Sequence, residues 1–269
     1  MRLQPVPPGA VVPLTDEDAR LPDEVPSKTK LSEELERLTE QLDAGQRALY
    51  AEGTRALLVV LQGRDASGKD GTLRRVFGPL DPLGVATTSF KAPSELELRH
   101  DYLWRVHQVV PPRGGIGIFN RSHYEDVLVV RVRRLVPEAV WRPRYQQINL
   151  FEQILIENGT VILKFLLHIS REEQRERLLA RLDDPEKYWK FNAGDLKERD
   201  LWDEYTEAYR EMLQRTSTAA APWYVVPADE KRVRDLLVAR TVTETLERMD
   251  PRYPGPPPEL DALRKALKA

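Results

Sequence analysis

The residues whose chemistry is easiest to interpret lie in the stretch LLVVLQGRDASGKDGT, at positions 57–72. An apolar run precedes a loop of the form G-x-x-x-x-G-K, and the backbone amides and lysine of such a loop hold a polyphosphate in nucleotide-using proteins. An ordinary strand–helix turn with a surface lysine is the alternative, but it would give the three glycines no shared purpose. We therefore expect phosphate contacts from the whole loop: Gly63, Ala66, Ser67, Gly68, Lys69, Asp70, Gly71 and Thr72.

Two carboxylates accompany this loop, although it should bind anions. Asp65 lies inside it, and Asp70 stands where such loops have a serine or threonine that holds magnesium. Carboxylates beside a phosphate chain repel it unless a divalent cation lies between them. Magnesium takes one or two carboxylates plus phosphate oxygens, so we predict that Asp65 and Asp70 bind Mg²⁺, with Mn²⁺ as the alternative ion. Asp70 could instead only favour the positive end of the helix that it begins.

A second polar cluster, NRSHYEDV, occupies positions 120–127 directly after the apolar run GIGIF. In phosphate-loop enzymes a strand near the first one often ends in an aspartate that helps to hold magnesium. Asn120 takes that place here, with Arg121 and Glu125 close behind. Taken alone, the cluster is better explained as a helix-capping turn with solvated charges.

Strands and helices alternate along most of the chain. A continuous apolar run predicts a strand buried on both faces at 56–62, and further strands are predicted at 85–90, 115–119, 161–169 and 222–228. Helical spacing of apolar residues predicts helices at 31–49, 69–77, 94–108, 123–134, 141–157, 171–182, 195–216 and 229–249, with Ser94 capping the third of them. This alternation indicates an α/β protein with a mostly parallel five-stranded sheet that helices cover on both faces.

The ends of the chain have a different composition. Six prolines lie in residues 1–28, which predicts an irregular N-terminal arm that lies on the domain. Residues 29–250 are predicted to form one domain, and residues 251–269 a proline-rich C-terminal tail.

Composition excludes several classes of protein. The chain has no cysteine, so a disulfide scaffold, a thiolate metal site and cysteine catalysis are all excluded. The formal net charge of −2 does not suggest a nucleic-acid-binding protein. Because there is neither an apolar run of about 18–20 residues nor a signal peptide, we expect no membrane association and a cytoplasmic location.

Four segments together resemble the polyphosphate kinase 2 family: GRDASGKDGT, FNRSHYED, DPEKYWKF and TSTAAAPWYVVPADEKR. The resemblance covers roughly residues 30–248, and FNRSHYED resembles the class III branch. It implies a three-layer αβα P-loop kinase fold similar to thymidylate kinase, with a helical lid at about residues 171–200. It also implies transfer of the terminal phosphate of inorganic polyphosphate to nucleoside mono- and diphosphates, AMP to ADP and ADP to ATP, with magnesium. Self-association into a dimer or tetramer is a further implication.

The resemblance assigns roles to individual positions. Asp65 and Lys69 match the first phosphate motif, and Asn120, Arg121 and Ser122 match the second. Glu125 occupies the position that differs between classes, where class III-like members are associated with acceptance of both mono- and diphosphates. The catalytic candidates are therefore Asp65, Lys69, Arg121 and Glu125, and the nucleotide-binding candidates are Asn120, Arg121, Ser122 and Glu125. Since the family often has aspartate at position 120, we expect Asn120 to hydrogen-bond a phosphate or a metal-bound water.

The segment after the fourth strand has one cationic face. On a helix beginning at Arg171, a rotation of about 100° per residue puts Gln174, Arg177 and Arg181 within an arc of about 60°. Arginine forks bind phosphate oxygens in pairs, and Lys187 and Lys190 extend the supply of positive charge. A solvated helix with intrahelical ion pairs is the alternative. The resemblance marks this segment as the lid that covers polyphosphate and excludes water.

Two rival functions stay open from the residues themselves. An ATP-dependent nucleotide kinase could use the same loop and a basic lid. A regulator that binds polyphosphate or nucleotides without turnover is the alternative from a different class. Which aromatic side chain contacts the base is also open, because spacing does not choose among the tryptophans and Phe90.

Overall fold

The computed structural model describes residues 1–21 and 25–268, and its centre is a parallel β-sheet. The strands are β1 (Ala56–Gln62), β2 (Val85–Ser89), β3 (Ile116–Asn120), β4 (Thr160–His168) and β5 (Trp223–Pro227). Their order across the sheet is β2-β3-β1-β4-β5, and every neighbouring pair is parallel. All five predicted strands are confirmed.

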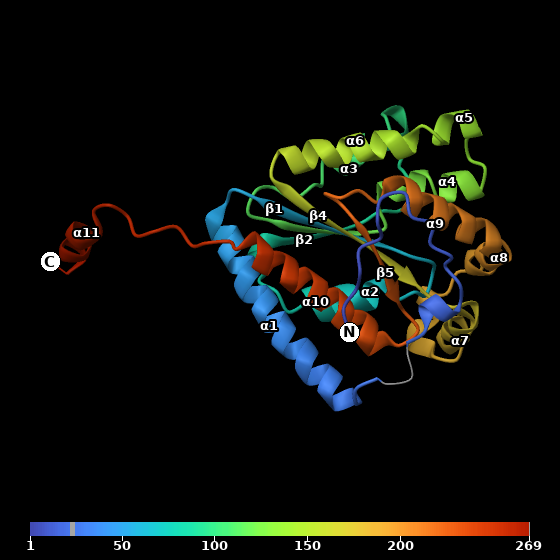
Figure 1. Cartoon of the computed structure of the whole chain (residues 1–269), viewed down its shortest axis with the longest axis horizontal. Helices are drawn as coiled ribbons and strands as arrows, with labels where there is room; N and C mark the ends of the chain where they lie inside the picture. Colours follow the sequence, from blue (N-terminus) through green and yellow to red (C-terminus); the bar gives the residue numbers. More distant parts are fainter. Residues whose placement is uncertain (22–24, 269) are drawn as a thin grey trace.

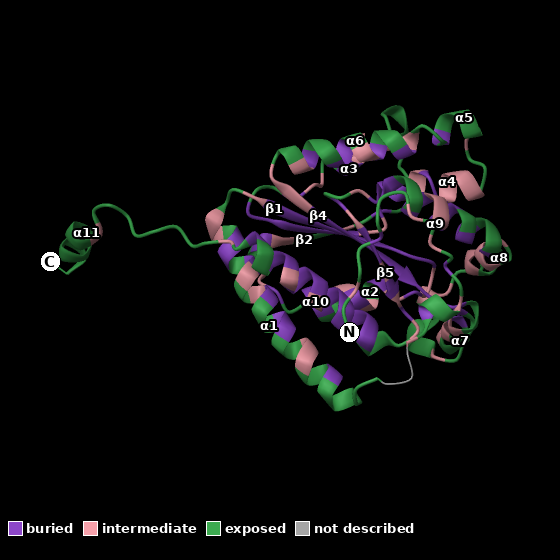
Figure 2. Ribbon diagram, in the orientation of Figure 1, coloured by how far each residue is buried: buried purple, intermediate pink, exposed green. Residues whose placement is uncertain are grey.

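Strand β1 shows why the molecule has three layers. Its odd residues Leu57, Val59 and Leu61 belong to a core with α1 (Lys28–Glu52) and α10 (Lys231–Met249). Its even residues Leu58 and Val60 belong to a second core with α6 (Arg144–Glu157) and α9 (Trp202–Thr216). Because side chains alternate between the faces of a strand, a run that is apolar throughout needs cover on both sides. Figure 1 shows these helix pairs on opposite faces of the sheet, and Figure 2 shows that β1 and most of β4 are buried between them, whereas β2 at the edge is not.

The remaining elements are short. The helices are α2 (Lys69–Thr72), α3 (Trp104–His107), α4 (Val129–Val132), α5 (Glu138–Trp141), α7 (Arg171–Leu182), α8 (Gly194–Asp200) and α11 (Leu260–Leu267). Short stretches of other helix types are η1 (Glu17–Ala19), η2 (Leu73–Phe77), η3 (Pro82–Gly84), η4 (Glu97–Arg99), η5 (His123–Asp126) and η6 (Pro185–Lys190), of which η2 is a π-turn that continues α2.

The helix predicted at 94–108 is wrong. Ser94 does form the predicted cap, since its hydroxyl accepts from the Glu97 amide at 3.3 Å while the Glu97 carboxylate accepts from the Ser94 amide at 2.6 Å. Only the turn η4 follows, because His100 is extended. The Asp101 carboxylate then accepts from the Leu103 amide at 2.9 Å and begins a separate turn that leads to α3. A second cap within the segment therefore divides the predicted helix.

Three other predicted helices are interrupted. The segment 123–134 consists of η5 and α4 and ends at Arg134, which has a positive φ of 53°. Pro143 separates α5 from α6, and Leu201 separates α8 from α9. These breaks change the direction of the chain around the carboxyl ends of the strands.

The two ends of the chain are placed differently. Val6 and Leu14 of the N-terminal arm are buried in the core. The Val6 amide donates to the Trp223 carbonyl, and the Val6 carbonyl accepts from the Ser217 hydroxyl. Residues 22–24 of the predicted arm lie outside the described residues. At the other end, α11 stands away from the body on an extended segment (Figure 1), a helix that was not expected within the tail. The domain limits at residues 28 and 250 remain predictions. Within the described ranges, every helix is too short or too polar to cross a membrane.

Candidate functional site

The sheet register brings the two phosphate motifs together. Leu61 of β1 pairs with Asn120 of β3, and Gln62 pairs with Leu166 of β4. The chain leaves β1 into the loop of residues 63–68, which opens α2, and leaves β3 into η5. Both motifs thus lie at the carboxyl edge of the sheet, where parallel α/β proteins bind their ligands.

The loop has the backbone of an anion nest. Gly63, Ala66 and Gly68 have positive φ values of 150°, 64° and 103°. A Cβ atom on Gly68 would lie 1.8 Å from Nη1 of Arg234 and would displace that guanidinium, and the φ of 103° is strained for any residue with a side chain. The buried Lys69 ammonium donates to the carbonyls of Gly63 at 2.7 Å and Arg64 at 3.1 Å. Burial, followed by the positive charge of Arg121, lowers the pKa of Lys69 to about 8.

Arg121 connects the carboxylates of the site. It forms an ion pair with Asp65, and its other terminal nitrogen lies 3.5 Å from Glu125. The backbone amide of Arg121 donates to the Leu61 carbonyl at 3.0 Å, which continues the pairing of the sheet by one residue. This bond holds the guanidinium at the end of β1, next to the loop.

The other residues of the second motif have separate surroundings. The side-chain amide of Asn120 donates to the Asp70 carboxylate at 2.8 Å, so these two predicted site residues are in contact. Ser122 is fully buried, and its hydroxyl accepts from Gln62 and Tyr124, each at 3.2 Å. Ser122 thus caps η5 and is sealed away from solvent.

A basic cavity of about 510 Å³ lies between the loop and the lid. Loop residues Asp65, Ala66, Gly68, Lys69, Asp70 and Gly71 line it, whereas the side chains of Ser67 and Thr72 are buried. Its basic residues far outnumber its acidic ones, which are Asp65, Asp70 and Asp195. The basic residues are Lys69, Arg75, Arg121, Arg177, Arg181, Lys187, Lys190, Lys231 and Arg234. Such a cavity attracts a polyanion.

A second, aromatic cavity of about 420 Å³ adjoins the first. Trp202, Tyr205 and Tyr209 of α9 line it, together with Glu125 and Gly63. Both cavities share three lining residues, which are Asp65, Arg121 and Asp195. A group bound in one cavity therefore meets a group bound in the other at these residues.

The predicted cationic face of α7 is divided by its contacts. Gln174 is buried, lines the aromatic cavity and donates to the Asp65 carbonyl at 2.9 Å. Arg177 is bound to carbonyls of the loop, at 2.9 Å from that of Ala66. Arg181 instead contacts the lid itself, at 3.1 Å from the Lys190 carbonyl and 3.3 Å from Asp195. With Lys187 and Lys190, Arg181 lines the basic cavity, and their binding of polyphosphate stays a prediction.

Several residues of the site were missed from the sequence. Lys231 and Arg234 come from the first turn of α10, Arg75 from η2, and Asp195 from α8. Burial and the charge of Asp65 raise the pKa of Asp195. The basic pair at 231 and 234 had a usable signal, because it follows the fifth strand at the same edge of the sheet as the loop. Asp195 had none, since the segment was predicted as part of one long helix.

The donor atoms suit a magnesium site that uses few protein ligands. Asp65 and Asp70 both line the basic cavity, and each holds a neighbouring residue through one oxygen atom, Oδ1. Across the described ranges, nowhere do three or more His, Asp or Glu side chains gather in a way that could bind a metal. Magnesium does not require such a cluster, because it is commonly bound by one or two carboxylates and by substrate phosphates.

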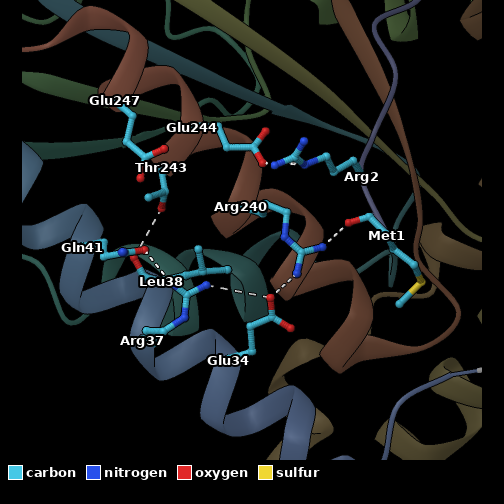
Figure 3. Close-up of a pocket in the computed structure, with 10 residues that line it drawn as sticks. All are labelled: Met1, Arg2, Glu34, Arg37, Leu38, Gln41, Arg240, Thr243, Glu244 and Glu247. Carbon is cyan, nitrogen blue, oxygen red and sulfur yellow. Dashed lines mark hydrogen bonds and ion pairs between the residues drawn. The ribbon is translucent and has the colours of Figure 1, made fainter.

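A third cavity, of about 630 Å³, lies apart from both motifs (Figure 3). It lies between the N-terminus, α1 and α10, and its arginines are already bound to protein oxygens. Arg2 pairs with Glu244 at 2.9 Å, Arg37 donates to Gln41 at 3.0 Å, and Arg240 pairs with Glu34. These contacts join the first residues to the two helices and make the cavity a poor phosphate site.

Comparison with known proteins agrees with this geometry. The family model described as Polyphosphate kinase 2 matches residues 26–254. The chain is 56% identical over 224 residues to the AMP/ADP-polyphosphate phosphotransferase of Meiothermus ruber, covering 83% of this chain and 84% of the relative. It is 47% identical over 253 residues to the ADP-polyphosphate phosphotransferase of Rhodopseudomonas palustris, covering 90% of this chain and 86% of the relative. The crystal structure of polyphosphate kinase 2 from Arthrobacter aurescens superposes with a TM-score of 0.88 at 41% identity, covering 91% of this chain and 88% of that one. The chain therefore belongs to the polyphosphate kinase 2 family and has its P-loop fold.

Proposed function

We propose that the protein transfers the terminal phosphoryl group of inorganic polyphosphate to AMP and ADP. The observation that carries this proposal is the meeting of the basic cavity and the aromatic cavity at Asp65, Arg121 and Asp195. A long phosphate chain suits the first cavity, and a nucleotide suits the second. Two relatives are named AMP/ADP-polyphosphate phosphotransferase and ADP-polyphosphate phosphotransferase, and these names support the same assignment.

The residues account for the reaction by positioning and charge. The acceptor's phosphate oxygen bonds to the terminal phosphorus of polyphosphate, and the bridging oxygen leaves with the shortened chain. Lys69 and the loop amides hold the donor, while Arg121 lies where negative charge moves between the two substrates. Phosphoryl transfer gains most of its rate from such alignment and electrostatic stabilisation, without a covalent intermediate.

We assign the metal to Asp65, with Asp70 as a second carboxylate, and name Mg²⁺ or Mn²⁺ as the ion. Bound there, the ion would neutralise phosphate oxygens that the two aspartates would otherwise repel. Arg121 already neutralises part of Asp65, and Asn120 orients Asp70. These contacts fix the two carboxylates before any metal arrives.

The aromatic cavity limits how an acceptor can bind. The Arg64 guanidinium lies 3.8 Å from the ring centroid of Trp202, so one face of that indole is covered by the protein itself. Tyr205 and Tyr209 are the aromatic candidates for contact with the base. Glu125 lies on the Arg121 side of the cavity, where a shorter acceptor would present its phosphate through water or a metal. A cytoplasmic dimer or tetramer remains the predicted form of the protein.

The test is a donor and acceptor matrix. Purified protein is incubated with long-chain polyphosphate or ATP as donor, and with AMP or ADP as acceptor, while the nucleotides are separated and quantified. We expect ADP from AMP and ATP from ADP with polyphosphate only, and complete loss of product with EDTA. Transfer from ATP alone would establish the ATP-dependent kinase, and saturable polyphosphate binding without product would establish the regulator.

A further inference from the structure

In the phosphate loop, the carbonyl groups of residues 63–67 all accept hydrogen bonds from side chains, and that of Gly68 accepts from the Thr72 amide at 3.0 Å. The Lys69 ammonium donates to the first two carbonyls, those of Gly63 and Arg64. Gln174 of α7 donates to the Asp65 carbonyl at 2.9 Å. Arg177, one turn further along α7, donates to the carbonyls of Ala66 at 2.9 Å and Ser67 at 3.3 Å. Arg234 of α10 reaches the Ser67 carbonyl as well, at 3.2 Å.

Arg177 uses every donor that it has. A guanidinium carries five N–H groups, and two of them go to the loop through Nη1. The two on Nη2 go to the carbonyls of Ala228 and Asp229 after β5, both at 2.7 Å. The last, on Nε, goes to the Glu173 carboxylate at 2.7 Å. The side chain is only 9% exposed, so it binds the loop to the turn after β5.

From these contacts we propose that Arg177 and Gln174 are positioning residues that orient the phosphate loop, and that neither is a ligand of polyphosphate. The proposal rests on the proposed function of the same site and revises the role predicted for the cationic face of α7. Since the C=O and N–H of a planar peptide unit point in opposite directions, holding the carbonyls on the α7 side turns the amides toward the basic cavity. Donors fixed in this way need no reorganisation when the phosphate arrives.

The neighbouring arginines provide matched comparisons. Arg181 lies on the same face of α7, but it contacts only lid atoms, at Lys190 and Asp195. It can exchange those contacts for phosphate oxygens without disturbing the loop. Arg175 is on the exposed side of the helix, paired with Glu172 alone. Arg177→Gln, Arg181→Gln and Arg175→Gln therefore remove the same charge in three different settings.

The decisive measurement is amide hydrogen exchange in the protein without substrates. We expect exchange at the loop amides of residues 64–69 to become at least about 10-fold faster in Arg177→Gln and to stay at the wild-type rate in the other two variants. A ligand of polyphosphate would leave exchange in the substrate-free protein unchanged, so unchanged rates in Arg177→Gln would overturn the proposal. If Arg177→Gln fails to fold, Gln174→Met gives the same test, since Asp65 has the only loop carbonyl to which Gln174 donates. Its other bond, from Arg199 at 2.8 Å, lies outside the loop, so exchange should become faster at the Ala66 amide.

Kinetics separate the two roles further. In Arg177→Gln we expect kcat to fall by about 10- to 100-fold, as for a misplaced reacting group, and to fall equally with tripolyphosphate and with long-chain polyphosphate. In Arg181→Gln we expect a raised KM for long-chain polyphosphate and a nearly unchanged kcat. A loss in Arg177→Gln that is confined to the KM for long chains would make it a polyphosphate ligand. If the wild-type protein uses no polyphosphate, the proposed function fails, while the exchange rates still decide whether Arg177 orients the loop.

Discussion

Arg121 combines backbone strain with charge at the point where the two cavities meet. Its φ of 60° lies in the left-handed region, which costs a residue with a Cβ of order 1–3 kcal/mol unless its surroundings hold it there. The amide bond to Leu61 and the pairs with Asp65 and Glu125 provide that hold. Held in this way, the side chain lines both cavities. The strain is thus consistent with the role proposed for Arg121.

Gly68 gives a prediction at the scale of one atom. The added methyl group of Gly68→Ala would meet Nη1 of Arg234 at 1.8 Å. The φ of 103° at Gly68 also disfavours any residue with a side chain. We expect polyphosphate-dependent transfer to fall at least about 100-fold, because the loop amides would shift from the phosphate. Gly255→Ala is the matched control, since nothing lies within 4 Å of its added Cβ. Product formation by both purified variants is the measurement, and near-native activity of Gly68→Ala would contradict this view of the loop.

At the scale of elements, the sequence predicted the structure best in segments where a single feature, such as a continuous apolar run, determines the element. Residues 56–62 form a strand because a continuous apolar run needs cover on both faces, and the observed bounds of β1 are the same. Polar segments such as 94–108 were misassigned, because two competing caps at Ser94 and Asp101 divide them. Helical spacing correctly put Arg177 and Arg181 on one face of α7. It contained no information on what packs against that face, so the binding of Arg177 to the loop could not be predicted.

Beneath the second phosphate motif, β4 and α6 share a buried ion pair. The Lys164 ammonium lies 2.6 Å from the Glu152 carboxylate, 2.7 Å from the Thr216 carbonyl and 3.0 Å from the Tyr124 hydroxyl, and both charged side chains are almost fully buried. Tyr124 also donates to Glu152 at 2.6 Å. Because Tyr124 belongs to η5, this cluster supports the turn that follows Arg121.

Removing one partner of that pair should be worse than neutralising both. Lys164→Met leaves the Glu152 charge buried without its cation, and we expect the free energy of unfolding to fall by about 3–5 kcal/mol. Adding Glu152→Gln removes the uncompensated charge and keeps an acceptor for Tyr124, so the double variant should recover a large part of the loss. Urea unfolding of the single and double variants measures both. Equal stability of the two variants would show that the unpaired Glu152 charge is not what destabilises Lys164→Met.

At the scale of the whole molecule, the two ends of the chain differ in how they meet the core. Val6 and Leu14 are buried against the sheet and α9, and the Val6 amide donates to the Trp223 carbonyl at 2.8 Å. Trp223 is itself fully buried. In α11, by contrast, not one described residue is buried, and the family match ends at residue 254. The N-terminal arm is thus part of the core, and the tail is an addition to it.

Deleting each end should therefore have opposite consequences. Loss of residues 2–15 uncovers Trp223 and removes Val6 and Leu14, each of which contributes about 1.5–3 kcal/mol by burial, so we expect a markedly lower free energy of unfolding. In the described part of residues 255–269 no side chain is buried, so loss of this segment should change the free energy of unfolding by less than about 0.5 kcal/mol, with transfer activity unchanged. Urea unfolding at two protein concentrations tests both deletions. Destabilisation by the tail deletion that grows with protein concentration would mean that α11 packs on a second copy of the chain, and the tail would then belong to the assembled molecule.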